Sequence, residues 1–129
     1  MTGDDVFGTD AGSNSMRAFL ASVGKGPHDL FLAQAVDSTS NSDLEIYALY
    51  VSGVDPVLLQ HAVITGGFFA TDANATVTAV TLGGKPVVEI KSGTEPAPVY
   101  FFSSHGVVFA VQTSVLHLAD HAIAMTPSV

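Results

Sequence analysis

The chain has 129 residues, a mass of 13.3 kDa and a formal net charge of −8, a size at which one hydrophobic core is expected and two are not. Four Lys and Arg against twelve Asp and Glu leave too little positive charge to neutralise a nucleic-acid backbone. The apolar runs are far shorter than the roughly 18 residues that a membrane-spanning helix needs. Cysteine is absent, which excludes a disulfide framework, a thiolate metal site and a cysteine nucleophile.

The first residues differ in composition from the rest of the chain. Residues 1–15 are acidic and rich in Gly and Ser, and they lack the basic start and apolar stretch of a signal peptide. We therefore expect residues 1–14 to form a flexible tail and residues 15–129 to form a single α+β domain. A first helix is predicted over Ser15–Val23, capped by Ser13 or Ser15 and ended by Gly24. Its apolar residues recur at helical spacing: Met16, Phe19, Leu20 and Val23.

Two strands and a second helix follow the first helix. The strands are predicted at Leu30–Val36 and Leu44–Val51, because both runs are rich in apolar residues and residues 37–43 between them favour turns. The helix is predicted over Pro56–Thr65, since Asp55 is a good N-cap and proline is favoured at the first helical position. Gly66-Gly67 should end it.

The second half of the chain predicts four more strands and a last helix. After a turn at residues 71–74, the strands are expected at Ala75–Leu82, Pro86–Lys91, Pro98–Ser103 and Val107–Gln112. Gly83-Gly84 and Ser104-His105-Gly106 are placed as hairpin turns. The last helix should run from a Ser114 cap to about Met125 and stop before Pro127. The predicted order is αββαββββα, an α+β fold with an antiparallel sheet of about six strands and three helices.

The last predicted helix contains the one pattern that resembles a metal site. His117 and His121 are four residues apart, the spacing at which two histidines on a helix can hold one metal ion, and Asp120 lies beside them. Zinc peptidases with the pattern H-x-x-E-H have Glu where this chain has Asp, and no third ligand stands out. The three residues share the polar side of the helix, so we expect a solvated face, with no metal and no cofactor. A metal-dependent hydrolase remains an alternative.

Several predicted strands are apolar on both faces, whereas a sheet with one face in water alternates apolar and polar residues. This holds for 46–51, Val99–Phe102 and Val107–Val111. We expect either that one helix crosses to the second face of the sheet or that a partner covers it. Charged residues make up only 12% of the chain, about half the usual share, so the surface itself favours association.

The sequence is compatible with three functions, and it contains no catalytic motif that would identify an enzyme. The preferred one is a non-enzymatic structural or protein-interaction domain that self-associates, as a homo-oligomer or a repeating assembly, at a cell surface or in a larger assembly. The second is a small-molecule-binding domain with a pocket between sheet and helices, lined by Tyr47, Tyr50, Tyr100 or Phe102. The third is the hydrolase that uses His117 and His121.

One resemblance extends over most of the chain after Asp29. It is carried by Asp29–Ala33, Ile46–Asp55, Gly83–Val87, Val99–Phe102 and Gly106–Val111. This succession resembles domains of uncharacterised bacterial cell-envelope proteins of a lipoprotein-like kind. The resemblance implies an extracytoplasmic setting and carries no catalytic residues. The chain lacks the lipobox and the signal segment of such proteins, so a cytoplasmic location stays open.

Overall fold

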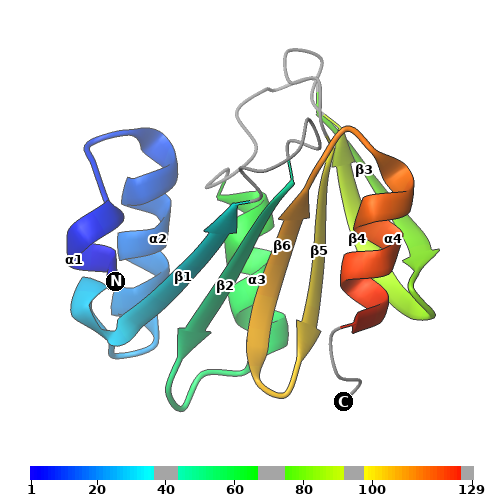
Figure 1. Ribbon diagram of the computed structural model, residues 1–129. Helices are drawn as coiled ribbons and strands as arrows, with labels where there is room; N and C mark the ends of the chain where they lie inside the picture. Colours follow the sequence, from blue (N-terminus) through cyan, green and yellow to red (C-terminus); the bar gives the residue numbers. More distant parts are fainter. Residues whose placement is uncertain (37–43, 67–74, 92–97, 126–129) are drawn as a thin grey trace.

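A computed structural model describes residues 1–36, 44–66, 75–91 and 98–125 (Figure 1). Its elements are α1 (Gly3–Val6), α2 (Ala11–Ser22), η1 (Pro27–Asp29), β1 (Leu30–Val36), β2 (Glu45–Val51), α3 (Pro56–Thr65), β3 (Thr76–Leu82), β4 (Lys85–Lys91), β5 (Val99–Ser104), β6 (Val107–Gln112) and α4 (Leu116–Met125). The predicted α+β fold with an antiparallel sheet is confirmed. The predicted turns at 37–43 and 71–74 and the stop at Pro127 lie outside the described residues.

The six strands form one antiparallel sheet in the order β1-β2-β6-β5-β4-β3. Three hairpins build it, and the first and last hairpins meet where β2 pairs with β6. Two of the hairpins turn through two residues with positive φ, Gly83-Gly84 and His105-Gly106. Tight two-residue turns with positive φ at both positions match the right-handed twist of the strands. In the strand order given above, β1 and β3 are the edges of the sheet.

The first long helix begins earlier than its sequence predicts. α2 starts at Ala11 and its N-cap is Asp10, not Ser13 or Ser15. The Asp10 carboxylate accepts hydrogen bonds from the backbone N–H and the hydroxyl of Ser13, at 3.0 and 2.8 Å. Hydrogen bonds from the backbone and then the side chain of Ser13 hold the pKa of Asp10 below its usual value. Ser13 therefore occupies the third helical position and donates its hydrogen bonds to the Asp10 cap. Serine is common both as a cap and near the start of a helix, so the residue type alone does not tell the two roles apart.

Residues 1–14, which the sequence predicts as a tail, make specific contacts in the structure. The Met1 ammonium group donates to the Leu32 carbonyl at 3.1 Å, and the Leu32 N–H donates to the Met1 carbonyl at 2.9 Å. Thr2 forms an antiparallel bridge with Phe31. The N-terminus thus pairs with the outer side of β1 near its start.

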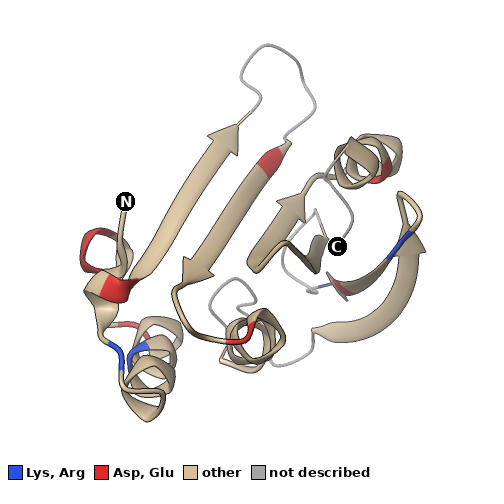
Figure 2. Cartoon of the chain, turned by 90° about the horizontal axis from the view of Figure 1, so that it is seen from below, with Lys and Arg blue, Asp and Glu red and all other residues tan. Residues whose placement is uncertain are grey.

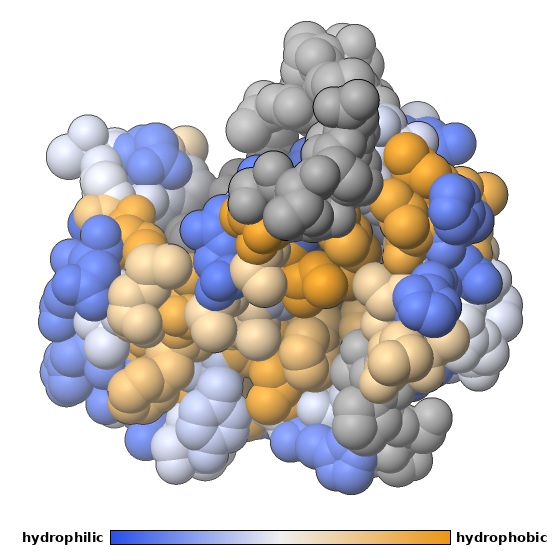
Figure 3. Space-filling model, in the orientation of Figure 1, coloured by the Kyte–Doolittle hydropathy of each residue, from blue (hydrophilic) through white to orange (hydrophobic). Residues whose placement is uncertain are grey.

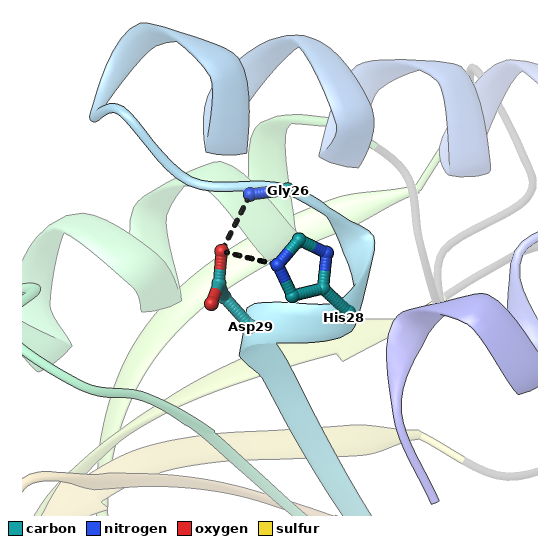
Figure 4. Close-up of polar contacts among 3 residues, drawn as sticks. All are labelled: Gly26, His28 and Asp29. Carbon is teal, nitrogen blue, oxygen red and sulfur yellow. Dashed lines mark hydrogen bonds and ion pairs between the residues drawn. The ribbon is translucent and has the colours of Figure 1, made fainter.

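A short turn connects α2 to β1. One carboxylate oxygen of Asp29 accepts a hydrogen bond from the Gly26 N–H at 2.8 Å and lies 3.5 Å from Nε2 of His28 (Figure 4). Because both partners of this ion pair are partly or fully exposed, its contribution to stability is small. His28 and Asp29 therefore have a local structural role at the start of β1.

The helices divide between the two faces of the sheet (Figures 1 and 2). α2 and α3 pack on one face, where their Met16, Leu20, Leu59 and Val63 meet buried residues of five strands. α4 packs on the other face, where Ala119 and Ile123 meet buried residues of β4, β5 and β6. α4 starts at Leu116, so Val115, and not the predicted Ser114, directly precedes it.

Candidate functional site

The face that carries α4 is only half covered. Seen from the front in Figure 1, α4 lies over the side of the sheet that β3, β4 and β5 form, and it also packs against β6. No described helix lies in front of β1 and β2. Register places eight apolar residues on this uncovered part, which we call the open face. They are Phe31, Ala33, Ala35, Ile46, Ala48, Tyr50, Val107 and Phe109.

Large side chains of the open face reach solvent. Phe31 is 52% exposed and Tyr50 is 41% exposed, and their ring centroids lie 6.5 Å apart across the β1–β2 pair. At the border with α4, the rings of Phe102 and Phe109 stack with centroids 5.2 Å apart. The space-filling view shows this apolar surface between the polar N-terminal side and α4 (Figure 3).

Charge is almost absent from the strands beneath the open face. Glu45 is the single charged residue of β1, β2 and β6, and it lies at the start of β2 (Figure 2). Its carboxylate accepts a hydrogen bond from the Tyr47 hydroxyl at 2.7 Å, and Tyr47 packs against the core on the α2–α3 side. Of the acidic residues that the structure describes, all but Glu45 therefore lie outside these three strands.

The four residues predicted to bind a small molecule are not brought together. Tyr50 lies on the open face, and Tyr47 lies on the opposite face of the sheet. Burial, followed by a hydrogen bond with Glu45, raises the pKa of Tyr47 to about 12. Tyr100 and Phe102 lie in the cluster beneath α4, and Tyr100 is only 2% exposed.

A groove of about 810 Å³ opens instead between α3 and the β3–β4 hairpin. Its lining includes Val57 and Gln60 from α3, and Pro86, Phe102 and Ser103 from the sheet. Pairing of β4 with β5 ends at Val88, which faces Phe101. The next hydrogen-bonded position along β4 is Pro86, which has no N–H to donate across to β5.

Proline inside a strand that is not an edge is therefore the sequence signal for this groove. Pro86 lies in β4, which has neighbours on both sides, whereas proline is normally confined to edges, strand starts and bulges. The sequence predicts Pro86 at the start of a strand, a position where proline is common, so the prediction included no groove there. Of the predicted ligand residues, the groove contains Phe102.

The residues of the predicted metal pattern face different surroundings. His117 and His121 are exposed on α4. The Asp120 carboxylate accepts a hydrogen bond from the Gly83 N–H at 2.7 Å, which ties α4 to the β3–β4 turn. Within the part of the chain that the structure describes, no three His, Asp or Glu side chains are grouped closely enough to hold a metal ion.

Comparisons of the chain with protein-family models, with curated proteins and with solved structures found no match. Over the described ranges, the helices are all too short or too polar to cross a membrane. The open face and the groove are therefore the two candidate sites of this chain.

Proposed function

We propose that this chain is a non-enzymatic protein-interaction domain that self-associates through the open face. The observation that supports the proposal is an apolar sheet surface, built on three adjacent strands, that none of the described helices covers. Contiguous apolar surface of this kind marks sites of protein association. Two copies related by a twofold axis would bury the same patch twice.

The exposed areas of Phe31 and Tyr50 allow the free energy gained by burying the open face to be estimated. Full burial of the exposed 52% of Phe31 and 41% of Tyr50 would remove roughly 200 Å² from water in each copy, given rings of about 200 Å². At about 25 cal/mol per Å² this is about 5 kcal/mol per copy and about 10 kcal/mol per pair. Association costs about 4–15 kcal/mol in lost freedom, so the two terms are similar. With the lowest of these costs the net is about −6 kcal/mol, which corresponds to a dissociation constant of some tens of micromolar. We therefore expect an association that becomes visible only at high protein concentration.

Light scattering of untagged protein across a concentration series tests this proposal. The mass should rise above 13.3 kDa with concentration. Phe31→Lys, which places a charge at the centre of the contact, should lower the mass at every concentration. Leu58→Lys is the matched control, because Leu58 is 54% exposed on the outer side of α3, away from the open face.

Two outcomes would contradict the proposal. One is a mass of 13.3 kDa at the highest concentration of the wild-type protein. The other is a Leu58→Lys variant whose mass falls as far as that of Phe31→Lys, because the effect would then come from charge alone.

The groove supports a second candidate function, the binding of an uncharged apolar molecule. Its volume of about 810 Å³ is in the range of small-molecule sites. Lys85 is the single charged residue among the described residues that line it, and its ammonium group donates to the Ile123 carbonyl at 2.7 Å. Continued by two residues, the β4–β5 register would set Ser103 opposite Pro86, which has no N–H to donate to the Ser103 carbonyl. A ligand with one N–H or O–H group would complement it.

The uncharged probe N-phenyl-1-naphthylamine, which carries one N–H, tests the groove by fluorescence. We expect saturable binding that Val57→Lys abolishes, since Val57 lines the groove. Leu58→Lys, one position along α3, and Phe31→Lys, on the open face, should keep it. Binding that Val57→Lys leaves intact would reject the groove as a ligand site.

A further inference from the structure

The outer edge of β3 is a second surface with unpaired backbone. Among the residues that the structure describes, β3 has a neighbour on one side only, β4. Leu82 and Lys85 flank the two-residue turn, so they form a hydrogen-bonded pair, and such pairs recur at every second residue. The N–H and C=O groups of Val77, Ala79 and Thr81 therefore point outward, away from β4.

This edge lacks the features that keep edge strands apart. β3 contains no charged residue, no proline and no glycine, and five of its seven residues are β-branched. Natural edges are usually blocked by lysine, proline, a bulge or a covering segment. Val77, the second residue of this strand, is 61% exposed. β3 thus combines high strand preference with an open hydrogen-bonding side.

The opposite edge of the sheet is different. The outward N–H and C=O of Leu32 on β1 are both bonded to Met1, and Thr2 bridges to Phe31. The chain therefore covers part of the β1 edge with its own N-terminus. Within the described residues, β3 receives no such cover.

We infer that β3 pairs antiparallel with β3 of a second copy, around a twofold axis at Ala79. The outward positions are symmetric about Ala79, so Val77 would meet Thr81 of the other copy and Ala79 would meet its counterpart. Each of these pairs exchanges two backbone hydrogen bonds. The small Ala79 side chain lies on the axis, where the two backbones approach.

The absence of charge on β3 favours a second copy of the chain as the partner of this edge. β3 carries no charge, so its self-pairing places no like charges opposite each other despite the net charge of −8. A peptide of another origin is normally selected through side-chain pockets or charged groups. β3 offers no charged group, and the pocket beside it is the groove that Ala79, Val80 and Thr81 help to line. In a symmetric pair the two strands are identical, so their backbone positions and side chains complement each other without such groups.

This inference rests on the proposed self-association and adds a second contact to it. The open face spans β1, β2 and β6, whereas the edge contact involves β3 at the far side of the sheet. One twofold contact gives a closed dimer, whereas two different twofold contacts on one chain join dimers into a closed tetramer where the axes cross at right angles and into an open repeating assembly where they do not meet. The expected product is therefore larger than a dimer, with a mass that rises with concentration.

Ala79→Pro tests the edge contact with little disturbance to the fold. The Ala79 N–H points outward, so proline removes no bond to β4, and proline is tolerated on strand edges. Ala79→Lys is a second variant in case proline unfolds the strand, because it places like charges on the axis. Circular dichroism and urea midpoints confirm that each variant is folded.

Light scattering of four proteins separates the two contacts. The wild type should grow beyond a dimer, Ala79→Pro and Phe31→Lys should each stop at a dimer, and the double variant should be a monomer. Unchanged growth in Ala79→Pro and in Ala79→Lys would overturn the edge inference while leaving the open face in place. Unchanged growth in Phe31→Lys, with a fall in Ala79→Pro, would instead reject the open face.

Hydrogen exchange of the Phe31→Lys variant gives an independent readout. The amides of Val77 and Thr81 should exchange roughly tenfold or more slowly in concentrated than in dilute solution, because pairing protects them. Exchange rates at these two residues that do not change with concentration would overturn the edge contact. The amides of Thr78 and Val80, which bond to β4, serve as internal references.

Discussion

Replacement of Gly83 by Ala tests how tightly α4 is held on the β3–β4 turn. Gly83 has φ +56°, and the left-handed region costs other residues about 1–2 kcal/mol. A Cβ at this position would meet the backbone N of Ala124, and it would lie 2.9 Å from both the Ala124 Cα and the Asp120 carbonyl oxygen. These atoms belong to a helix backbone and cannot move singly, so the helix must shift, which adds about 1–3 kcal/mol. We expect a total loss of about 2–5 kcal/mol.

Gly84 provides the matched control for this prediction. It has φ +77°, and a Cβ there would meet nothing within 4 Å. Gly84→Ala should therefore lose only the conformational part, about 1–2 kcal/mol. Urea unfolding followed by circular dichroism gives both free energies. Equal losses in the two variants would refute the argument that α4 packs directly against the turn.

Further predictions concern a cap, a tyrosine and a histidine pair. Asp55→Ala should lower stability by about 0.5–2 kcal/mol, because the Asp55 carboxylate accepts from the Val57 N–H at 2.9 Å; a variant as stable as the parent would contradict this cap. Burial and then the bond with Glu89 raise the pKa of Tyr100 to about 12. The stability that this shift contributes is complete below pH 10, the pKa in the unfolded chain, and is lost between pH 10 and 12, up to about 3 kcal/mol for two pKa units. Tyr100→Phe should flatten the dependence of stability on pH in that range. His117→Ala combined with His121→Ala should leave stability and metal content unchanged, as measured by urea unfolding and elemental analysis of protein purified without added metal. Stoichiometric zinc that disappears in the double variant would revive the hydrolase.

Local signals accounted for most of the helix and strand positions. Asp55 and Pro56 start α3 at the predicted residue, because the cap and the fixed φ of proline act within one turn of chain. Gly66 also follows α3 as predicted, but for a different reason. Its φ is −77°, and a Cβ there would lie 2.7 Å from the Ala62 carbonyl and 2.9 Å from the Ser15 Cβ. Close approach of α2 and α3, which no local pattern reveals, is what makes glycine necessary.

For the candidate sites too, some features follow from the local sequence and others from contacts between distant residues. Alternation along the strands was enough to predict that both faces of the sheet carry apolar groups, since side-chain direction depends only on position in the strand. Strand order, and with it the meeting of β2 and β6, depends on contacts between residues more than fifty positions apart. That order placed α4 over β3, β4, β5 and part of β6, away from β1 and β2, and so decided where the open face lies. The register of β4 against β5 decided the role of Pro86, which lines the groove. Proline has no backbone N–H, and this matters only where a carbonyl of the neighbouring strand would otherwise accept a hydrogen bond from it.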